Sequence, residues 1–590
     1  MLGIFGIING HLGRSSVVRG ARLGELIHDA EPLTCGLIDR FTNTKFLEDK
    51  VFEGDADTFI CLDGIIFNLR DLKLKLGLKL PFQILKRLYE EHGERFVGEL
   101  RGHFCGCLYD KRENKWLIFT DPISSKPIFY VDDELFLFSS KIQRITKTLA
   151  QMGRKYRIDE LGAYFLITYQ FMLGNHTLIS EIKKLKPGCY LRYSQNSYEI
   201  VSYHQFSGRP LLQASEDEIV DRVDCLFRNG IEAEYNKDLE YGYEHFATLS
   251  GGLDSRMTVM VAREMGFGPC MNLTFSQSNY WDELIAKQIA ADLGNPFLFF
   301  ALDGGNYLKN VHGPLLANDG LVSYQGAAHL FAALQAVNCS RYGLLHSGQL
   351  GDAVMGSYLA APRHSAPDAR RGAYSTRLLE RISAEADAIA RQYESEEIFL
   401  LYNRGFNGIL NGNQIASQFT EGVASPFLMT EFLDYCLKIP PAFRYNHRMR
   451  VRWIVERHPT AANYIWAKTG AKPFRNRAKL QVNASRLWRG IQRRARRACA
   501  PFLTKQSQPV AKVDSMNPFQ YWYHTNATLR DFIDSYVVEK IAILDDFPNL
   551  RQDCLKLATT GTCKEKLQVV SLLAALELHF CPNTNPHTLQ

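Results

Sequence analysis

The segment LSGGLDSR holds the residue types that bind a phosphate group. Its two glycines let the backbone approach a phosphate closely, and its serine hydroxyls can donate hydrogen bonds. Asp254 is negative and would repel a phosphate, so its simplest role is to bind Mg²⁺ directly or through water. A serine-capped glycine turn without a ligand is the structural alternative. The candidate phosphate-binding residues are Leu249, Ser250, Gly251, Gly252, Asp254 and Ser255.

The elements on either side of this segment are expected to position it. EHFATLS, before the segment, has the composition of a strand, and SRMTVMVAREMG, after it, has helical spacing. A helix N-terminus offers N–H groups and the positive end of the helix dipole to an anion. The strand MNLTFS, the helix DELIAKQIAADLG and the strand FLFFAL continue the alternation, which predicts a parallel sheet covered by helices. The second helix is expected to place its apolar residues on one face: Leu284, Ile285, Ile289 and Leu293.

Residues 1–207 differ in pattern from the rest of the chain. They consist of short predicted strands bounded by Gly, Asp, Asn or Pro, with one helical stretch at 82–92. The alternation of strands and helices begins near residue 216, and the chain beyond the third strand is expected to be mainly helical. A length of 590 residues fits two to four domains.

Composition limits the classes of protein that fit. Hydrophobic residues at 46% and charged residues at 22% are typical of a soluble globular protein, and a net charge of +6 does not indicate a nucleic-acid binder. The 13 cysteines have no regular spacing, which indicates reduced thiols. Cys105 and Cys107 share one face of a predicted strand, which favours core positions over a metal pair. The N-terminus lacks a signal-peptide pattern and no segment approaches about 20 apolar residues, so a cytoplasmic protein is expected.

A basic stretch covers residues 475–512. Eleven Lys or Arg residues and no Asp or Glu lie between Phe474 and Val513. One interpretation is a solvated helix with flexible flanks. The other is a cationic surface for an anionic partner, such as phospholipid headgroups, a polyanionic substrate or a nucleic acid. Because the net charge of the chain is small, a partner protein or a peripheral membrane contact is expected here, and a nucleic acid is not.

The motifs of the chain follow the order of a known family. LSGGLDSR is not a Walker loop, because no Gly-Lys-Ser or Gly-Lys-Thr follows; it resembles the PP-loop of the ATP-pyrophosphatases, which implies ATP and Mg²⁺ as cofactors. Other segments are similar to those of asparagine synthetases of the B type. They are GIFGIING, DGIIFNL, GELRGHFCGCLYD, DPISSKPIFY, FSSKIQRI and LKPGCYLRY in the first part, and WDELIAKQIAADLG, HSGQLGDAVMGSY, SPFLMTEFLDYCLKIP and WAKTGAKPF in the second.

This resemblance implies two domains and further site residues. Residues 1–207 would form a glutaminase-like domain of the N-terminal-nucleophile type, an αββα sandwich. Residues 216–590 would form a synthetase domain with a doubly wound parallel sheet and a helical C-terminal part. Asp254 and Asp352 would share Mg²⁺ and pyrophosphate. The other implied residues are Ser347 and Gly348 at the nucleotide, Leu273 in the adenine pocket, and Lys468, or Lys472 four residues on, as the lysine that neutralises the adenylate and pyrophosphate.

Several positions depart from the family pattern. The family's nucleophilic cysteine is replaced by Leu2, which has no nucleophilic atom. The family's Asn-Gly oxyanion pair begins here with Asp63, whose carboxylate would repel an oxyanion. The N-terminal domain is therefore expected to be a structural or docking module. Gln349 replaces a glutamate that handles a proton during ammonia attack, and an amide is not a general base at neutral pH. Asp319 could contact substrate or cap a helix.

The sequence predicts a ligase that adenylates a carboxylate with ATP and forms an amide without hydrolysing glutamine itself. The substrate is expected to be a small-molecule, glycan or peptide carboxylate. Similar proteins that lack the cysteine include β-lactam synthetases, lasso peptide cyclases and asparagine synthetase-like proteins of surface-polysaccharide clusters. Three alternatives stay open: a lasso-type macrolactam cyclase that uses a substrate amine, an ammonia-dependent asparagine synthetase, and a non-catalytic binding or regulatory protein that kept the fold.

Overall fold

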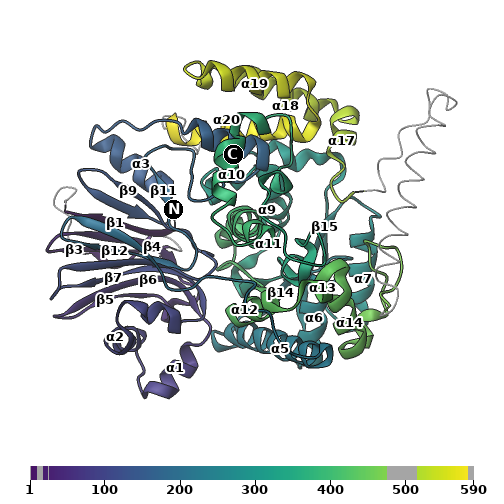
Figure 1. The fold of residues 1–590 in the computed structure, drawn as a ribbon, viewed down its shortest axis with the longest axis horizontal. Coiled ribbons are helices and arrows are strands. Elements are labelled where there is room, and N and C mark those ends of the chain that lie inside the picture. The colour runs from purple at the N-terminus through teal and green to yellow at the C-terminus, as the bar shows by residue number, and fades with distance from the viewer. Residues whose placement is uncertain (1, 10–17, 24–25, 475–514, 582–590) are drawn as a thin grey trace.

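The computed structural model describes residues 2–9, 18–23, 26–474 and 515–581. It contains an N-terminal domain of two antiparallel sheets, purple and blue in Figure 1, and a larger part with a parallel sheet and most of the helices, teal to yellow. The basic stretch at 475–512 lies outside the described residues, so its predicted role stays a prediction.

The two sheets of the N-terminal domain pack face to face. Their facing side chains form one core that contains Ile4, Cys107 and Trp116. The first sheet has the strand order β11 (Lys183–Lys184), β9 (Phe129–Asp132), β10 (Phe136–Ser139), β1 (Gly3–Ile8), β4 (Gly36–Asn43), β3 (Leu26–Leu33), β2 (Val18–Leu23). The second has the order β13 (Ser197–Ser202), β12 (Cys189–Ser194), β8 (Lys115–Thr120), β7 (Gly102–Asp110), β6 (Thr58–Ile66), β5 (Val51–Gly54).

Helices cover the outer faces of both sheets. α1 (Leu69–Leu76) and α2 (Pro81–His92) pack on the six-stranded sheet, and α3 (Ile142–Gln151) and α4 (Glu160–Tyr169) pack on the seven-stranded sheet. This αββα arrangement confirms the fold class expected for the N-terminal domain. Sequence periodicity located α2 but not α4, because α4 is buried on all sides and so lacks an amphipathic pattern.

The five strands of the other sheet are parallel. Their order is β16 (Phe297–Ala301), β15 (Cys270–Ser276), β14 (Glu244–Thr248), β17 (Tyr342–His346), β18 (Val423–Ala424). Ala247 of β14 packs with one set of helices and its neighbour Phe246 with another, so both faces are covered. This confirms the predicted doubly wound class. The covering helices are α5 (Glu216–Glu240), α6 (Asp254–Glu264) and α7 (Trp281–Leu293) on one face, and α8 (His312–Asn318) and α9 (Ala328–Gln335) on the other.

Helix α7 departs from its expected burial at one position. Ile285 and Ile289 are buried as predicted, but Leu284 is 48% exposed. Successive residues of an α-helix point about 100° apart, so Leu284 lies at the edge of the face that Ile285 and Ile289 bury. The expectation of four residues on one buried face was wrong for Leu284.

The rest of the chain is mainly helical within the described residues, as predicted. Helix α20 packs against α4 of the N-terminal domain and against α8, so it contacts both parts of the molecule (Figure 1). The C-terminal helices are α17 (Phe519–Thr525), α18 (Ala527–Lys540), α19 (Pro548–Thr560) and α20 (Cys563–Phe580). Those before the basic stretch are α10 (Leu379–Ala390), α11 (Glu396–Leu400), α12 (Thr430–Lys438), α13 (Pro441–Arg444), α14 (Arg448–Arg457) and α15 (Pro459–Ala462).

Two other expectations concern cysteines and membranes. Cys105 and Cys107 are both buried in the core between the two antiparallel sheets, which confirms them as core residues. No disulfide joins cysteines of the described residues. In that same part of the chain, no helix combines the length and the apolar character needed to cross a bilayer.

Candidate active site

The strand order of the parallel sheet reverses at β14, which lies between β15 and β17. At such a point the connections leave to opposite faces and open a crevice at the carboxyl ends of the strands. A cavity of about 320 Å³ lies there. The structure brings eight predicted site residues together in its lining: Leu249, Ser250, Gly252, Asp254, Ser255, Leu273, Ser347 and Gly348.

The phosphate loop, residues 249–255, is stabilised by its own serines. The Ser250 N–H donates to Ser255 Oγ at 3.0 Å, and the Gly252 N–H donates to Ser250 Oγ at 3.2 Å. Helix α6 begins at Asp254, and no described side chain caps its N-terminus. N–H groups without a partner inside the helix attract an anion to this end, together with the helix dipole. The loop can therefore receive a phosphate group.

Gly251 does not line the cavity, but its backbone bonds the phosphate loop to neighbouring segments. Its N–H donates to Asp282 Oδ1 at 2.8 Å, and its carbonyl accepts from the Ala467 N–H at 3.1 Å and from Arg256 at 3.3 Å. A Cβ at Gly251 would lie 2.9 Å from the Ala467 Cβ, so a larger residue would push the two segments apart. Arg256 is fully buried and also donates to the carbonyls of Ala461, Tyr464 and Ile465.

A second loop, residues 347–352, packs directly on the phosphate loop, and we call it the nucleotide loop. A Cβ at Gly348 would lie 2.2 Å from the carbonyl carbon of Asp254, and a Cβ at Gly351 would lie 2.8 Å from Asp254 Cγ. Only glycine permits this approach. The contact brings Asp352 close enough for its charge to act on Asp254, although Asp352 is not part of the cavity lining.

Asp254 has the charge environment of a cation ligand. Burial raises its pKa to about 7, while the positive Arg450 lowers it and the negative Asp352 raises it. A guanidinium nitrogen of Arg450 lies 2.5 Å from Asp254 Oδ1 and forms an ion pair with it. Carboxylate oxygens are the ligands that Mg²⁺ prefers, and a cation between the two carboxylates would offset their repulsion. The residues present therefore fit Mg²⁺.

The two predicted lysines lie outside the cavity lining. Lys468 Nζ donates to His447 Nε2 at 2.8 Å and lies 5.7 Å from the ring centroid of Trp466. Its neighbour Ala467 donates its N–H to the Gly251 carbonyl at 3.1 Å, which places Lys468 beside the phosphate loop, and the charge of Lys468 lowers the pKa of Asp254. Lys472 is exposed, and the structure does not bring it into the cavity.

Three residues that fix the site were missed by the sequence analysis. Arg256 is the last residue of LSGGLDSR and Asp282 lies in the WDEL segment, so both had a motif that could have indicated them. Arg450 lies on α14, far along the chain from Asp254, and no local pattern marks it.

Two family matches agree with this geometry. The family described as asparagine synthase matches residues 227–560, which is more than half of the chain, and the glutamine amidotransferase domain matches residues 49–204. The chain belongs to the asparagine synthase family.

Relatives of this asparagine synthase family member are distant in sequence. Asparagine synthetase [glutamine-hydrolyzing] 1 of Bacillus subtilis (strain 168) is 25% identical over 253 residues, 41% of this chain and 38% of that protein. Asparagine synthetase B [glutamine-hydrolyzing] of Escherichia coli (strain K12) is 22% identical over 407 residues, 65% of this chain and 63% of that protein. The match thus spans less than two thirds of these relatives. A solved allosteric regulatory enzyme of purine biosynthesis aligns with 75% of this chain and 93% of its own at 11% identity, but its TM-score of 0.25 supports no inference.

In this asparagine synthase family member, a second cavity of about 80 Å³ lies between the two domains. Leu2 and Asp63, which depart from the family pattern, both line it. Asp63 accepts hydrogen bonds from Thr42 Oγ1 at 2.8 Å and from Lys126 Nζ at 3.0 Å. Although burial opposes ionisation, the charge of Lys126 holds the pKa of Asp63 below its usual range. Position 63 therefore carries a paired anion in place of an amide donor.

Gln349 lines both cavities, as do Asn413 and Val423, so the two cavities are neighbours. Gln349 Nε2 donates to the Ile409 carbonyl at 3.2 Å, and its Oε1 accepts no hydrogen bond from the described residues. An amide at this position offers a donor and an acceptor to a ligand, but it cannot remove a proton as a base.

Asp319 caps a helix of the other domain. It is buried at the end of α8, and its Oδ1 accepts from the N–H of Ile142, the first residue of α3, at 3.0 Å. Lys141 Nζ lies 3.6 Å from the other carboxylate oxygen. Of the two roles expected for Asp319, the structure supports the capping role.

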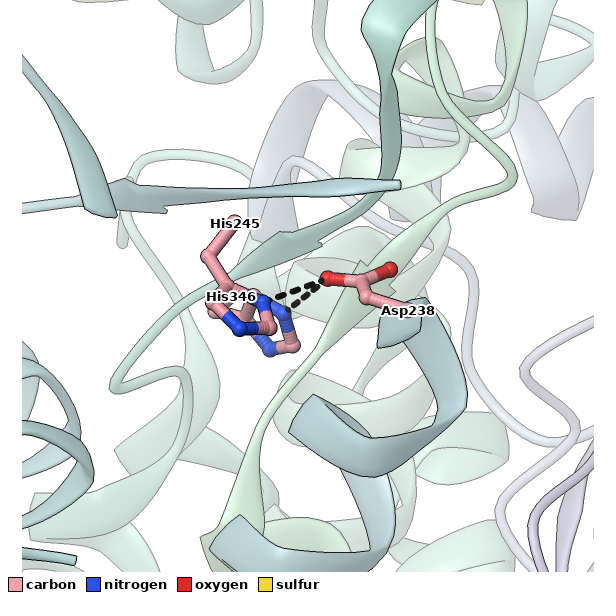
Figure 2. A group of neighbouring side chains, drawn as sticks. All are labelled: Asp238, His245 and His346. Atoms are coloured by element: carbon pink, nitrogen blue, oxygen red, sulfur yellow. Dashed lines mark hydrogen bonds and ion pairs between the residues drawn. The ribbon is translucent and has the colours of Figure 1, made fainter. Parts of the chain in front are cut away.

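A buried polar cluster supports the strand that carries the nucleotide loop (Figure 2). Asp238 Oδ2 lies 2.7 Å from His346 Nε2 and 3.3 Å from His245 Nδ1. Burial opposes protonation of His346, but Asp238 and Glu234 raise its pKa to about 9, so the ring is charged at neutral pH. These residue types also bind metals, but the hydrogen-bond distances from Asp238 to both rings indicate an ion-paired cluster. Because His346 precedes Ser347, the cluster fixes the start of the nucleotide loop.

Proposed function

We propose that this chain is an ATP-dependent ligase that adenylates a carboxylate and joins it to a nitrogen nucleophile without hydrolysing glutamine itself. The observation that carries the proposal is the contact between the phosphate loop and the nucleotide loop, which brings Asp254 and Asp352 together at the switch point of the parallel sheet. A phosphate-binding helix N-terminus beside two carboxylates is an arrangement suited to ATP with Mg²⁺. Membership in the asparagine synthase family favours the same chemistry.

The reaction requires two displacements, and the residues of the site suit the first. A substrate carboxylate oxygen bonds to the α-phosphorus of ATP as the bond to pyrophosphate breaks. The α6 N-terminus and the hydroxyls of Ser250 and Ser255 would hold the phosphates, and the apolar Leu273 would pack on the adenine. Asp254 and Asp352 would hold Mg²⁺, which neutralises charge on the departing pyrophosphate when bound. Lys468 would add a further positive charge.

The second displacement forms the amide: the amine attacks the acyl carbon, AMP leaves, and the amine loses a proton. Gln349 lies where both cavities meet and cannot act as the base. We therefore propose that the nucleophile is deprotonated by another group, in solution or on the substrate. A small-molecule, glycan or peptide carboxylate is the substrate class that we propose.

The cavity between the domains supports the absence of glutamine hydrolysis. Leu2 has no nucleophilic atom, and the carboxylate of Asp63 is unsuited to stabilise an oxyanion. Cys105 also lines this cavity, but burial raises the pKa of its thiol well above the usual value. It would therefore remain protonated and unreactive.

ATP–pyrophosphate exchange with purified protein and Mg²⁺ tests the proposal. Aspartate, uronic-acid sugars and carboxylate-bearing peptides are supplied in turn, with Asp254→Asn as the inactive variant and glutamate release from glutamine measured in parallel. We expect exchange with one substrate class, its loss in Asp254→Asn, and no glutamate release. Stimulation by aspartate would favour ammonia-dependent asparagine synthesis, and stimulation by a peptide a macrolactam cyclase. No exchange and no ATP binding by calorimetry would refute the ligase and leave a binding protein.

A further inference from the structure

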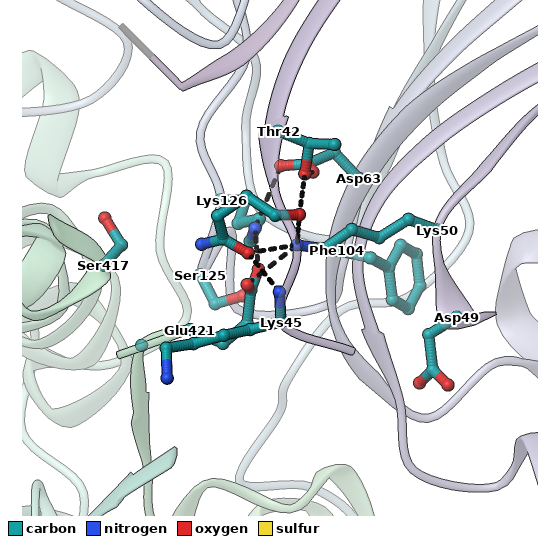
Figure 3. A network of polar contacts seen from close by, with 12 residues as sticks. Thr42, Lys45, Asp49, Lys50, Asp63, Phe104, Ser125, Lys126, Ser417 and Glu421 are labelled. Atoms are coloured by element: carbon teal, nitrogen blue, oxygen red, sulfur yellow. Dashed lines mark hydrogen bonds and ion pairs between the residues drawn. The ribbon is translucent and has the colours of Figure 1, made fainter. Parts of the chain in front are cut away.

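Alternating charges cross the interface between the two domains beside the second cavity (Figure 3). Lys126 Nζ donates to Asp63 Oδ2 at 3.0 Å and to Glu421 Oε1 at 2.7 Å. The other oxygen of Glu421 accepts from Lys50 Nζ at 2.9 Å. Glu421 belongs to the synthetase part, and the other three residues belong to the N-terminal domain. We call Lys50, Asp63, Lys126 and Glu421 the interdomain network.

The interdomain network is shielded from water. The side chains of Lys50 and Glu421 are 1% and 3% exposed, and that of Lys126 is 16% exposed. Both carboxylate oxygens of Glu421 are bonded to lysines of the N-terminal domain, so its position is fixed from two directions. Removing one partner would leave a buried charge without its counter-charge, which is strongly unfavourable. Glu421 therefore moves only if the N-terminal domain moves with it.

Glu421 begins the segment that supports the nucleotide loop. Three residues later, the carbonyl of Ala424 accepts from the N–H of Ser347 at 2.9 Å and from its Oγ at 3.3 Å. The next residue, Ser425, donates its hydroxyl to the Gln349 carbonyl at 3.0 Å. The segment that Glu421 anchors thus holds both ends of the Ser347-Gly348-Gln349 sequence.

We propose that Glu421 is a positioning residue through which the N-terminal domain holds the nucleotide loop in place for ATP. Lysines of the N-terminal domain fix Glu421, Glu421 fixes the start of β18, and β18 fixes Ser347. The effect on catalysis rests on the proposed function, but the physical link does not. The N-terminal domain is then part of the synthetase site, although Leu2 offers it no nucleophile.

A second buried ion pair between the domains provides a matched control. Asp49 of the N-terminal domain lies 2.8 Å from Lys237 Nζ of α5, and both side chains are 1% exposed or less. Asp49 Oδ2 also accepts from the Ile66 N–H at 2.8 Å. Asp49→Asn and Glu421→Gln are the same chemical change at buried interdomain pairs. Glu421 lies on the segment that bonds to the nucleotide loop, whereas Asp49 is linked to the loop only indirectly, because its partner Lys237 precedes Asp238, which contacts His346.

Hydrogen–deuterium exchange of the full chain without ligand tests the link. We expect the Ser347 amide, read from a peptide spanning the nucleotide loop, to exchange at least about tenfold faster in Glu421→Gln. The segment of its acceptor then loses the side-chain anchor and keeps only its backbone bonds to β17, from the Glu421 N–H to the Gly343 carbonyl and from the Leu345 N–H to the Gly422 carbonyl. In Asp49→Asn the same amide should change by less than about twofold at a comparable melting temperature. If Glu421→Gln does not fold, Lys50→Gln, which leaves Lys126 on Glu421, takes its place with an expected increase of about threefold.

Steady-state kinetics distinguish a positioning role from a purely structural one, because only a positioning role is expected to change the KM for ATP. The KM for ATP should rise about tenfold in Glu421→Gln with kcat within about threefold, and Asp49→Asn should leave both unchanged. Wild-type protection of Ser347 and a wild-type KM in folded Glu421→Gln would overturn the positioning role, as would equal loosening in Asp49→Asn. A wild-type chain without ATP–pyrophosphate exchange would refute the proposed function alone, since deuterium exchange would still decide the role of Glu421.

Discussion

Replacing Gly348 by alanine is expected to disrupt the ATP site while the protein stays folded. The added Cβ would lie 2.2 Å from the carbonyl carbon of Asp254, whereas real Cβ atoms essentially never approach within 3.0 Å. The nucleotide loop must then retreat from the phosphate loop by at least the difference of about 0.8 Å. Inserting an atom into a packed contact costs about 1–3 kcal/mol, which corresponds to ATP binding weakened by about 5- to 150-fold.

Calorimetric titration with ATP and Mg²⁺ measures this loss. Gly326→Ala is the control, because a Cβ there would meet no described atom within 4 Å. Melting temperatures establish that both variants are folded. If folded Gly348→Ala bound ATP within about twofold of wild type, the contact between the two loops would not shape the site and the reasoning would be refuted.

Three further predictions test other parts of the site. The pKa of His346 is raised from 6.5 to about 9 on folding. Protonated His346 therefore adds about 3 kcal/mol to the free energy of unfolding below pH 6.5, and this contribution is lost as the pH rises through 9. The stability gap between wild type and His346→Gln, measured by urea unfolding, should therefore narrow over that range; a constant gap would contradict the charge assigned to His346. Arg256→Met removes the buried donor of four backbone carbonyls and should lower the unfolding free energy by about 2–4 kcal/mol; an unchanged melting temperature would argue against this role. Lys468→Met should slow ATP–pyrophosphate exchange about a hundredfold and Lys472→Met less than about threefold, and equal effects would show that the two lysines were assigned wrongly.

Sequence patterns located the elements that their own residues specify. The phosphate loop could be found because its glycines, serines and Asp254 are nearly consecutive, and β14 and α6 flank it as the composition predicts. Helix α5 has a capping box of Ser215 and Glu218, a pattern that is visible in the sequence. Helix α4 could not be found from periodicity, because tertiary packing buries it on every side.

Contacts between distant segments could not be predicted. Arg450 contacts Asp254, and Asp319 caps a helix of the other domain, but neither has a neighbour in sequence that indicates its partner. The same holds for Glu421, whose lysine partners lie in a separate domain. These contacts follow from how the two domains dock, and a local pattern carries no information about docking.

The position of the phosphate loop in the chain has a consequence for protein synthesis. The carbonyl of Gly251 bonds to Ala467, and Arg256 donates to carbonyls between residues 461 and 465. Translation proceeds from the N-terminus, so almost four fifths of the chain must leave the ribosome before these partners exist. Contacts so far apart in sequence have a large loop-closure entropy and form late in folding. Nucleotide binding would thus require chains in which residues 461–467 have been made, and bound ATP would favour the folded form of these contacts.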